Sequence, residues 1–404
     1  MDFLLPPDDD PQRKAVREWL TEHPRPTGRE LAEAGYVVPH WPRPWGVDAG
    51  PIEQLVIDEE LARAGVRRPD NPIGIGWAGP TIVLAGTAEQ KDRYLWPLLS
   101  GEEVWCQLFS EPGAGSDLAN LATRAVKDGD EWVVNGQKIW TSGARRSKFG
   151  ILVARTDPDV PKHKGISYFL CPMDLPGIEI RPIKQMTTDA DFNEVFFTDV
   201  RLPGASLVGE ENRGWALAKV TLGNERVSLS GGGALWGAGP SASDLLAIVR
   251  AGGGCDDPVV RQRLAALYIH GEVLRLIRLR TLTARLKGEQ PGPEASVRKI
   301  LADEHGQEIM GLALDLLGAA GLIDAYVPAD QAAATTSLDD PIWRYGFLFS
   351  AALTIGGGTG EVQRNIVAER VLGLPHDIDV ESGKSWRESR DAATASAPGR
   401  PDPR

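Results

Sequence analysis

The chain has 404 residues, of which 42% are hydrophobic and 12 are tryptophan, and this predicts two or three domains with a sizeable core. A net charge of −12 argues against nucleic acid and anionic membranes as partners, although local basic residues can still bind a small anion. The three isolated cysteines and six scattered histidines predict neither a disulfide framework nor a zinc site.

Targeting and membrane signals are weak in this sequence. The first residues, Met-Asp-Phe-Leu-Leu-Pro, lack the basic region and the long apolar core of a signal peptide. No segment approaches the roughly 20 uninterrupted apolar residues of a transmembrane helix. We therefore expect a soluble, cytoplasmic protein with no membrane partner.

Helical patterns dominate residues 1–104. Within residues 51–65, Ile52 and Leu61 belong to a set of apolar residues near helical spacing, and Gly65 is a typical helix end. The first part of the chain is therefore predicted to be helical.

Residues 105–210 change to short strand-like segments between turn residues. Residues 131–140 are predicted to be two strands around an Asn135-Gly136 turn, because this dipeptide is the strongest short hairpin signal. The spacing of the segments predicts a small antiparallel barrel or sandwich. Further strands are predicted at residues 149–154, 166–171, 178–183 and 194–197.

The helical period returns from about residue 211 and predicts a helical bundle. After about residue 380 the chain is polar and rich in Ser, Ala, Pro and Arg, which predicts a disordered tail at 379–404. Helices at both ends and strands between them make an α+β fold, not an alternating α/β fold. The predicted domains are 1–104, 105–210 and 211–378, and the predicted helices of the last are 211–236, 259–287, 294–319, 341–354 and 360–372.

The most informative stretch of the chain reads QLFSEPGAGSD at residues 107–117. Glycine lets the backbone approach a ligand closely, and the serines and backbone N–H groups can bind an oxygen-rich ligand. On its own this stretch is equally typical of a polar surface turn. About 25 residues later, a second segment reads NGQKIWTSG at residues 135–143, and the pair is more specific than either segment alone.

Together these two segments resemble the flavin-binding strands of the acyl-CoA dehydrogenase family. The resemblance runs from about residue 50 to 375 and includes NERV at 224–227 and TGEVQRNIVAERVLGLP at 359–375. It implies an N-terminal helical domain, a middle antiparallel β-barrel and a C-terminal four-helix bundle, with FAD as the cofactor.

The resemblance also implies which residues contact the flavin. In the family pattern Trp140 covers the isoalloxazine ring, Ser142 hydrogen-bonds near N5, and Ser116 touches the FAD phosphates or the substrate pantetheine. Trp140 alone would more often be a core tryptophan, and the flanking motifs reverse that interpretation. The implied cofactor-binding residues are Gln107, Phe109, Ser110, Gly115, Ser116, Trp140, Thr141, Ser142, Thr359 and Glu361.

The reaction implied by the resemblance is α,β-dehydrogenation of an acyl-CoA thioester, with hydride transfer to flavin N5 and electron-transferring flavoprotein as the electron acceptor. A thioester α proton is a weak acid. The site must therefore raise the basicity of its carboxylate by desolvation and stabilise the enolate-like oxygen with aimed donors. One of the family's donors is a backbone N–H, which here would belong to Gly357.

The catalytic base departs from the commonest family pattern. Many members carry it in a Glu-Gly-Thr string, but residues 355–359 read IGGGT, with Gly357 at the place of the glutamate. Other members carry the base on an earlier helix, directly before an arginine, and Glu225 and Arg226 occupy that place. We expect Glu225 to be the base and Arg226 to lie near the substrate or to be a structural ion partner. Without the resemblance, Glu225 would be taken for a solvated helix residue.

The part of the site that would hold the FAD adenosine also departs from the family. An Arg-x-x-Phe-Gly string and a Gln-x-x-Gly-Gly string are replaced by DDPVVRQRL at 256–264 and DLLGAAG at 315–321. Thr359 and Glu361 match positions that contact the AMP part. Arg261 and Arg263 are proposed to pair with the FAD phosphates in place of the missing strings. The same two residues are as well explained as part of a solvated helix face.

Two other interpretations keep the same fold. The chain is alternatively a non-catalytic, flavin-poor partner subunit, which the altered adenosine-end strings favour, or a flavin monooxygenase, which would not need a carboxylate at Glu225. The family assembles through its bundle as a homotetramer or an α2β2 heterotetramer. Glycines at 231–233 and 356–358 suggest room for a bulky, even polycyclic, acyl group.

Overall fold

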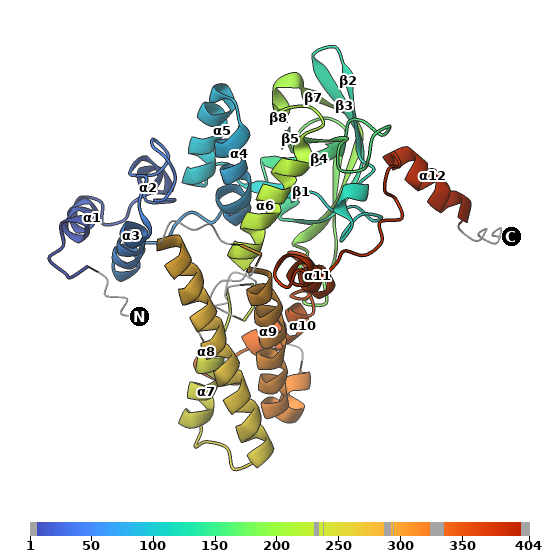
Figure 1. Cartoon of the computed structure of the whole chain (residues 1–404). Coiled ribbons are helices and arrows are strands. Elements are labelled where there is room, and N and C mark those ends of the chain that lie inside the picture. Colours follow the sequence, from blue (N-terminus) through green and yellow to red (C-terminus); the bar gives the residue numbers. More distant parts are fainter. Residues whose placement is uncertain are drawn as a thin grey trace.

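The computed structural model of the chain describes residues 6–229, 234–236, 238–286, 292–293, 295–323 and 335–396. Figure 1 shows N-terminal helices, then a β-sheet, then a second group of helices with two long members side by side. This order confirms the predicted α+β fold. Helix α6 lies between the N-terminal helices and the sheet and contacts both (Figure 1).

Local signals set the ends of the N-terminal helices. Thr27 and Thr87 form capping boxes with Glu30 and Gln90, so that backbone N–H groups at these two helix starts have acceptors. Gly65 follows its helix with a φ of 67°, as expected for a glycine at a helix end. The helices are α1 Pro11–Glu22, α2 Gly28–Glu33, α3 Pro51–Arg63, α4 Gly79–Ala85 and α5 Ala88–Ser100, with a π-helical turn at Gly74–Ala78.

The strands form one sheet in the order β6-β7-β3-β2-β4-β5-β8, with β1 paired to β4. Most neighbours are antiparallel, as predicted, but β1 and β2 both run parallel to β4. Strand β4 is buried along its whole length, which is typical of a strand covered on both faces. The strands are β1 Trp105–Leu108, β2 Arg124–Asp128, β3 Glu131–Ser142, β4 Phe149–Arg155, β5 Ile166–Pro172, β6 Ile178–Pro182, β7 Phe192–Pro203 and β8 Leu207–Val208.

The predicted hairpin turn at Asn135-Gly136 is wrong. Residues 131–142 form the single strand β3, and the turn that joins it to β2 contains Gly129, with a φ of 61°. Gly136 instead lies at an irregularity in the pairing of β3 with β7, where a Cβ would come within 2.4 Å of the Thr123 hydroxyl. This glycine therefore permits close approach of a neighbouring segment.

The second group of helices corresponds to the five predicted segments and adds one more. Helix α9 packs against α8, α10 and α11. The added helix, α7, begins at a capping box formed by Ser241 and Asp244 and lies between the first two predicted segments. Residues 230–233 of the first predicted segment lie outside the described residues. The helices are α6 Gly214–Leu229, α7 Ala242–Ala251, α8 Pro258–Leu286, α9 Ala295–Leu317, α10 Ile342–Ser350 and α11 Gly360–Arg370.

Three hydrophobic cores hold these elements. The first joins the N-terminal helices, one face of the sheet and α6, and includes Tyr168 and Ala218. The second lies on the other face of the sheet, around Phe169. The third lies among the C-terminal helices, around Trp343. Among the described helices, none has the length and apolar composition that crossing a membrane requires.

The disorder predicted for the C-terminal tail is wrong for its first part. The described residues continue to 396 and include α12 Trp386–Ser396, which lies beside the sheet and away from the long helices (Figure 1). The Trp386 N–H donates to the Val160 carbonyl at 2.9 Å, and the Arg155 guanidinium lies 4.8 Å from the indole. These contacts outweigh the polar composition on which the prediction of disorder rested. The chain beyond α12 lies outside the described residues.

Candidate active site

The glycine-rich loop follows β1 directly and is closed by its own backbone. Glu111 and Ala114 exchange two backbone hydrogen bonds of 3.0 Å across Pro112-Gly113. A Cβ at Gly113 or Gly115 would meet no atom within 4 Å, so contacts within the described chain do not demand glycine at either position. Open space beside a closed loop suits a ligand that approaches the backbone closely.

A buried ion pair holds this loop from inside. The Glu111 carboxylate accepts hydrogen bonds from the Ala122 and Thr123 N–H groups at 2.7 and 2.9 Å and from the Lys138 ammonium at 2.8 Å. Lys138 also donates to the Phe109 carbonyl at 2.9 Å. Burial alone would raise the pKa of Glu111, but Lys138 and the hydrogen bonds outweigh it and hold the pKa below its ordinary value. The pair therefore ties the loop to β3.

The end of β3 lies beside the same loop. The Ile139 N–H donates to the Ser110 carbonyl at 2.9 Å, which joins the two motif segments. Trp140 has a φ of 61° and keeps 58% of its surface exposed, with its ring edge-on to Phe192. A bulky residue in the left-handed region is rare and often marks a functional site. Thr141 is buried, and its hydroxyl has no hydrogen-bond partner among the described residues.

Glu225 lies on α6 beside β1. Only 8% of its surface is exposed, and it accepts a hydrogen bond from the Gln107 amide at 3.3 Å. One turn earlier on α6, the Thr221 hydroxyl lies 2.9 Å from the Thr81 hydroxyl and 3.1 Å from the Tyr168 hydroxyl. These contacts fix α6 between α4 and β5. The structure thus brings the predicted base against one of the predicted flavin-side residues.

The glycine string before α11 bends the chain sharply. Gly357 has a φ of 68°, a conformation that favours glycine. Its carbonyl and that of Gly358 accept hydrogen bonds from the Gln363 amide at 3.1 and 3.4 Å, while its N–H has no acceptor within the described part of the chain. A Cβ at Gly356 would lie 2.5 Å from the Trp236 ring. The space freed at Gly356 is therefore filled by an indole and not left open.

The two residues predicted to contact the AMP part lie at the start of α11. Thr359 caps the helix through its hydroxyl. Glu361 is exposed in the first turn, where hydrogen bonds from its own N–H and from the Thr359 hydroxyl lower its pKa. A cavity of about 390 Å³ opens between this helix start and α9, and its lining also includes Asp303, Gln307 and Arg364. Both predicted AMP contacts therefore border one cavity.

Ser116 and Arg263 lie on more open surface, whereas the side chain of Phe109 is buried in the first core. Ser116 is exposed, and the next residue, Asp117, forms an ion pair of 2.9 Å with Lys162. Arg263, a predicted substitute for phosphate pairing, forms an exposed ion pair of 2.7 Å with Asp315. To pair with a phosphate, Arg263 would therefore have to break its ion pair with Asp315.

Some predictions fall outside the described residues, and some site residues were not predicted. The side chain of Arg226 and the glycines at 231–233 are not described. Lys138 and Thr221 support the site but carry no sequence signal of their own, because each acts through a partner that is distant along the chain. The one sequence feature that indicates a role for Lys138 is its position inside the second motif segment.

The residues present fit a flavin at the junction of the two motif segments. Within the two joined segments, the described part of the chain leaves the Trp140 indole exposed, the buried Thr141 hydroxyl without a partner and open space at Gly115. Ser142 is half-buried at the end of the same strand. A flat ring with an apolar body and a hydrogen-bonding edge would satisfy these groups together.

Three family models match successive parts of the chain. They are described as the N-terminal domain of acyl-CoA dehydrogenase, at residues 10–102, the middle domain, at residues 106–200, and the C-terminal domain, at residues 212–372. Together they cover most of the described chain.

Known proteins are similar to the chain over most of its length. Acyl-CoA dehydrogenase FadE34 of Mycobacterium tuberculosis is 44% identical over 85% of the chain, which spans only 45% of that relative. Acyl-CoA dehydrogenase IpdE1 of the same species is 39% identical over 88% of the chain and 89% of its own length. The solved structure of the Tcur3481-Tcur3483 steroid ACAD aligns with a TM-score of 0.73 and 32% identity, over 93% of this chain and 100% of the other.

Proposed function

The chain belongs to the acyl-CoA dehydrogenase family, a family of oxidoreductases, and we propose that it is an FAD-dependent enzyme that converts an acyl-CoA thioester into a trans-2-enoyl-CoA. The observation that carries this proposal is the hydrogen bond of 3.3 Å from Gln107 to Glu225. It puts a buried carboxylate against the strand that leads into the flavin motif. We propose the same division into domains at residues 1–104, 105–210 and 211–378.

The two joined motif segments are proposed to hold FAD. When bound, FAD supplies the acceptor for the β hydrogen of the substrate. Support for the site comes from Trp140 and Thr141, because the fold leaves an exposed indole there and a buried hydroxyl that has no partner among the described residues. The residues proposed to contact FAD are Gln107, Phe109, Ser110, Gly115, Ser116, Trp140, Thr141, Ser142, Thr359 and Glu361.

Glu225 is proposed to remove the α proton of the thioester. Its burial supports this role, because loss of water strengthens a carboxylate as a base. The Gln107 amide orients the carboxylate, and Thr221 fixes the helix one turn away. The base is therefore held by regular elements, which position a side chain more precisely than a loop does.

The thioester oxygen is proposed to accept a hydrogen bond from the Gly357 N–H. Support comes from the absence of an acceptor for this N–H within the described chain and from the left-handed bend that orients it. A fixed donor aimed at a developing negative charge is a large source of rate acceleration. Arg226 and Ser116 are the other residues proposed to lie along the substrate.

A bulky, polycyclic acyl group is the proposed substrate class. The likeness to the Tcur3481-Tcur3483 steroid ACAD supports this choice. A straight-chain acyl-CoA is therefore expected to react more slowly than a thioester that carries fused rings.

Reduction of the enzyme-bound flavin under anaerobic conditions tests the function. Wild-type protein mixed with a steroid acyl-CoA is expected to lose its oxidised flavin absorbance. Glu225→Gln should keep its flavin but lose at least about 100-fold in the rate of bleaching, the lower range for loss of a general base. Glu210→Gln, which changes an exposed glutamate just before α6, is the matched control and should bleach normally. Undiminished bleaching in Glu225→Gln would refute the base assignment.

A flavin-poor partner subunit of an α2β2 heterotetramer is the second candidate function. The ion pair of Arg263 with Asp315 favours this alternative. Arg263 lies where the family's adenosine-end string is changed, and it is paired with a carboxylate instead of a phosphate. A chain that is colourless when purified alone, and that gains flavin only with a second subunit, would support this alternative. A yellow homotetramer that passes electrons to electron-transferring flavoprotein would support the enzyme.

A further inference from the structure

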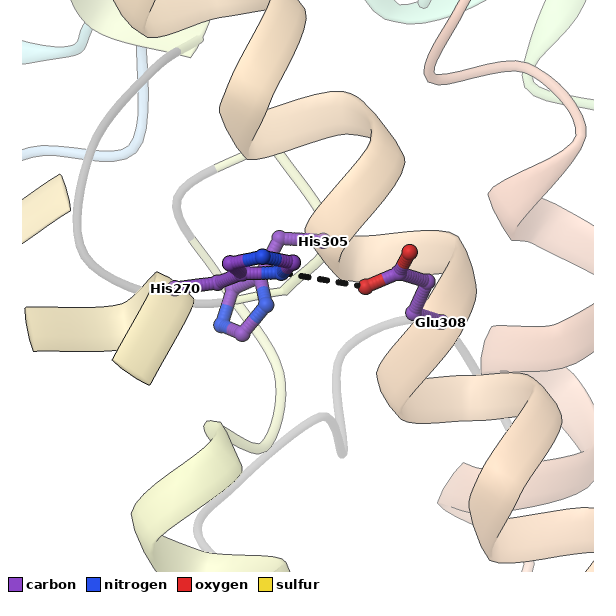
Figure 2. Close-up of side chains that lie close together, drawn as sticks. All are labelled: His270, His305 and Glu308. Atoms are coloured by element: carbon purple, nitrogen blue, oxygen red, sulfur yellow. Dashed lines mark hydrogen bonds and ion pairs between the residues drawn. The ribbon is translucent and has the colours of Figure 1, made fainter. Parts of the chain in front are cut away.

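Two imidazoles and a carboxylate meet where α8 and α9 face each other (Figure 2). His305 and Glu308 lie three residues apart on α9 and therefore share a face of that helix. His270 approaches them from α8, with its Nδ1 at 3.4 Å from a Glu308 carboxylate oxygen. One potential ligand atom from each of the three residues lies within 4.8 Å of the others.

His305 is the buried member of this cluster. Only 8% of its surface is exposed, and its Nδ1 has no hydrogen-bond partner among the described residues. Its ring lies against the backbone of α8, because a Cβ added at Gly271 would be 3.5 Å from the Nε2 atom. Buried polar atoms are nearly always paired, so an imidazole with a nitrogen that lacks a partner among the described residues, in a group with two other metal-binding side chains, suits a ligand.

We propose that His270, His305 and Glu308 bind one divalent transition-metal ion, with Zn²⁺ as the preferred occupant. Two imidazoles and one carboxylate are a ligand set that suits zinc and leaves a fourth position for water or for another molecule. Mg²⁺ and Ca²⁺ are disfavoured because they prefer oxygen ligands.

The geometry supports a tetrahedral ion. With metal–ligand bonds of about 2.0–2.1 Å, two ligands of a tetrahedral zinc lie about 3.3 Å apart, and the His270–Glu308 separation is 3.4 Å. His270 and Glu308 are exposed, so rotation of their side chains can close the longer separations in the group.

The proposed site differs from the expectation that the scattered histidines form no zinc site. His270 and Glu308 are 38 residues apart in sequence, so no short ligand spacing exists for a sequence pattern to detect. Two packed helices bring the ligands together instead, as in other helical bundles that carry metals between facing helices. A bound ion would tie α8 to α9.

Isothermal titration of the chelator-treated, full-length protein with ZnCl₂ tests the proposal. One zinc ion is expected to bind per chain. His270→Gln and Glu308→Gln should each weaken zinc binding by at least about tenfold, since even outer-shell partners of a metal site are worth that much. Both positions are exposed, so these variants are expected to fold normally, and circular dichroism checks that they do.

The matched control is His376→Gln. His376 pairs with Glu369 at 2.9 Å on an exposed surface, as His270 does with Glu308, but no third ligand joins that pair among the residues the structure describes. Its loss should leave the zinc isotherm unchanged. The proposal is overturned if wild-type protein binds no zinc, if Glu308→Gln and His270→Gln bind it as wild type does, or if His376→Gln abolishes binding.

Discussion

A single buried ion pair, Glu111 with Lys138, decides whether the glycine-rich loop keeps its shape. Glu111→Gln would leave the Lys138 ammonium buried without its counter-ion, and removing one partner of such a pair typically costs about 3–5 kcal/mol. We expect the free energy of unfolding, measured in urea at pH 7, to fall by that amount. Glu179→Gln is the matched control, because Glu179 pairs with Arg181 on an exposed strand and should cost less than about 1 kcal/mol.

The same pair gives the expected pH dependence. The pKa of Glu111 is held below its ordinary value of 4.5 in the folded chain. Its stabilising contribution is therefore complete above about pH 4.5 and is lost as the pH falls toward the folded-state pKa. The difference in unfolding free energy between wild type and Glu111→Gln should shrink on acidification below pH 4.5. An equal difference at pH 7 and at pH 3.5 would contradict this account.

Sequence could name the residues of the site more easily than the contacts that position them. Glu225 was predicted because a family pattern places a base before an arginine, and the structure puts it beside Gln107. The contact of Thr221 with Thr81 joins residues 140 positions apart. No local pattern indicates which of many distant hydroxyl groups will meet, because the packing of whole helices decides it.

At the scale of elements, the Trp386 side chain is one of the contacts that hold α12 beside the sheet. The Trp386 indole lies 4.8 Å from Arg155 and 5.0 Å from Arg390, and its N–H donates to the Asn120 carbonyl at 3.3 Å. Trp386→Ala removes these contacts while leaving the three cores intact. We expect faster trypsin cleavage and faster amide exchange after residue 378, with little change in the melting temperature.

A second variant separates the indole from the charges around it. Arg387→Gln removes an exposed ion pair with Asp159 but keeps the tryptophan, and exposed pairs contribute little. Its amide-exchange rates after residue 378 should match wild type; amide exchange is the comparison here, because the substitution removes a trypsin cleavage site. If Trp386→Ala also matches wild type, another contact anchors α12, and the ion pair of Lys162 with Glu381 is the next one to test.

Periodicity predicted the long elements well and the short, context-dependent ones poorly. Helices α8 and α9 follow from long helical patterns. By contrast, the Asn135-Gly136 dipeptide predicts a turn where the structure has strand β3, and the polar composition predicts disorder where the structure has α12. Both errors have one physical cause: a tertiary contact, with Thr123 in the first case and Arg155 in the second, overrides the local preference.

At the scale of the whole molecule, the proposed active site joins the middle and C-terminal parts of the chain. Gln107 comes from the sheet, Glu225 from α6 and Gly357 from the turn before α11 (Figure 1).

The C-terminal helices also leave one face uncovered within the described chain. On α8, large apolar side chains are exposed at Val259, Tyr268, Ile269, Val273 and Leu276. An apolar row of this size on a helix surface indicates association with another chain.

We therefore expect the purified protein to be an oligomer that associates through α8, as the proposed homotetramer or α2β2 assembly requires. Ile269 and Leu276 are 57% and 55% exposed, so the double variant Ile269→Glu, Leu276→Glu should not disturb the fold of one chain. It should place charges in the interface and shift the mass measured by light scattering toward that of a monomer. Val126→Glu, at a 55% exposed position on β2, is the matched control and should keep the wild-type mass. If the double variant keeps that mass as well, the chains associate through another face.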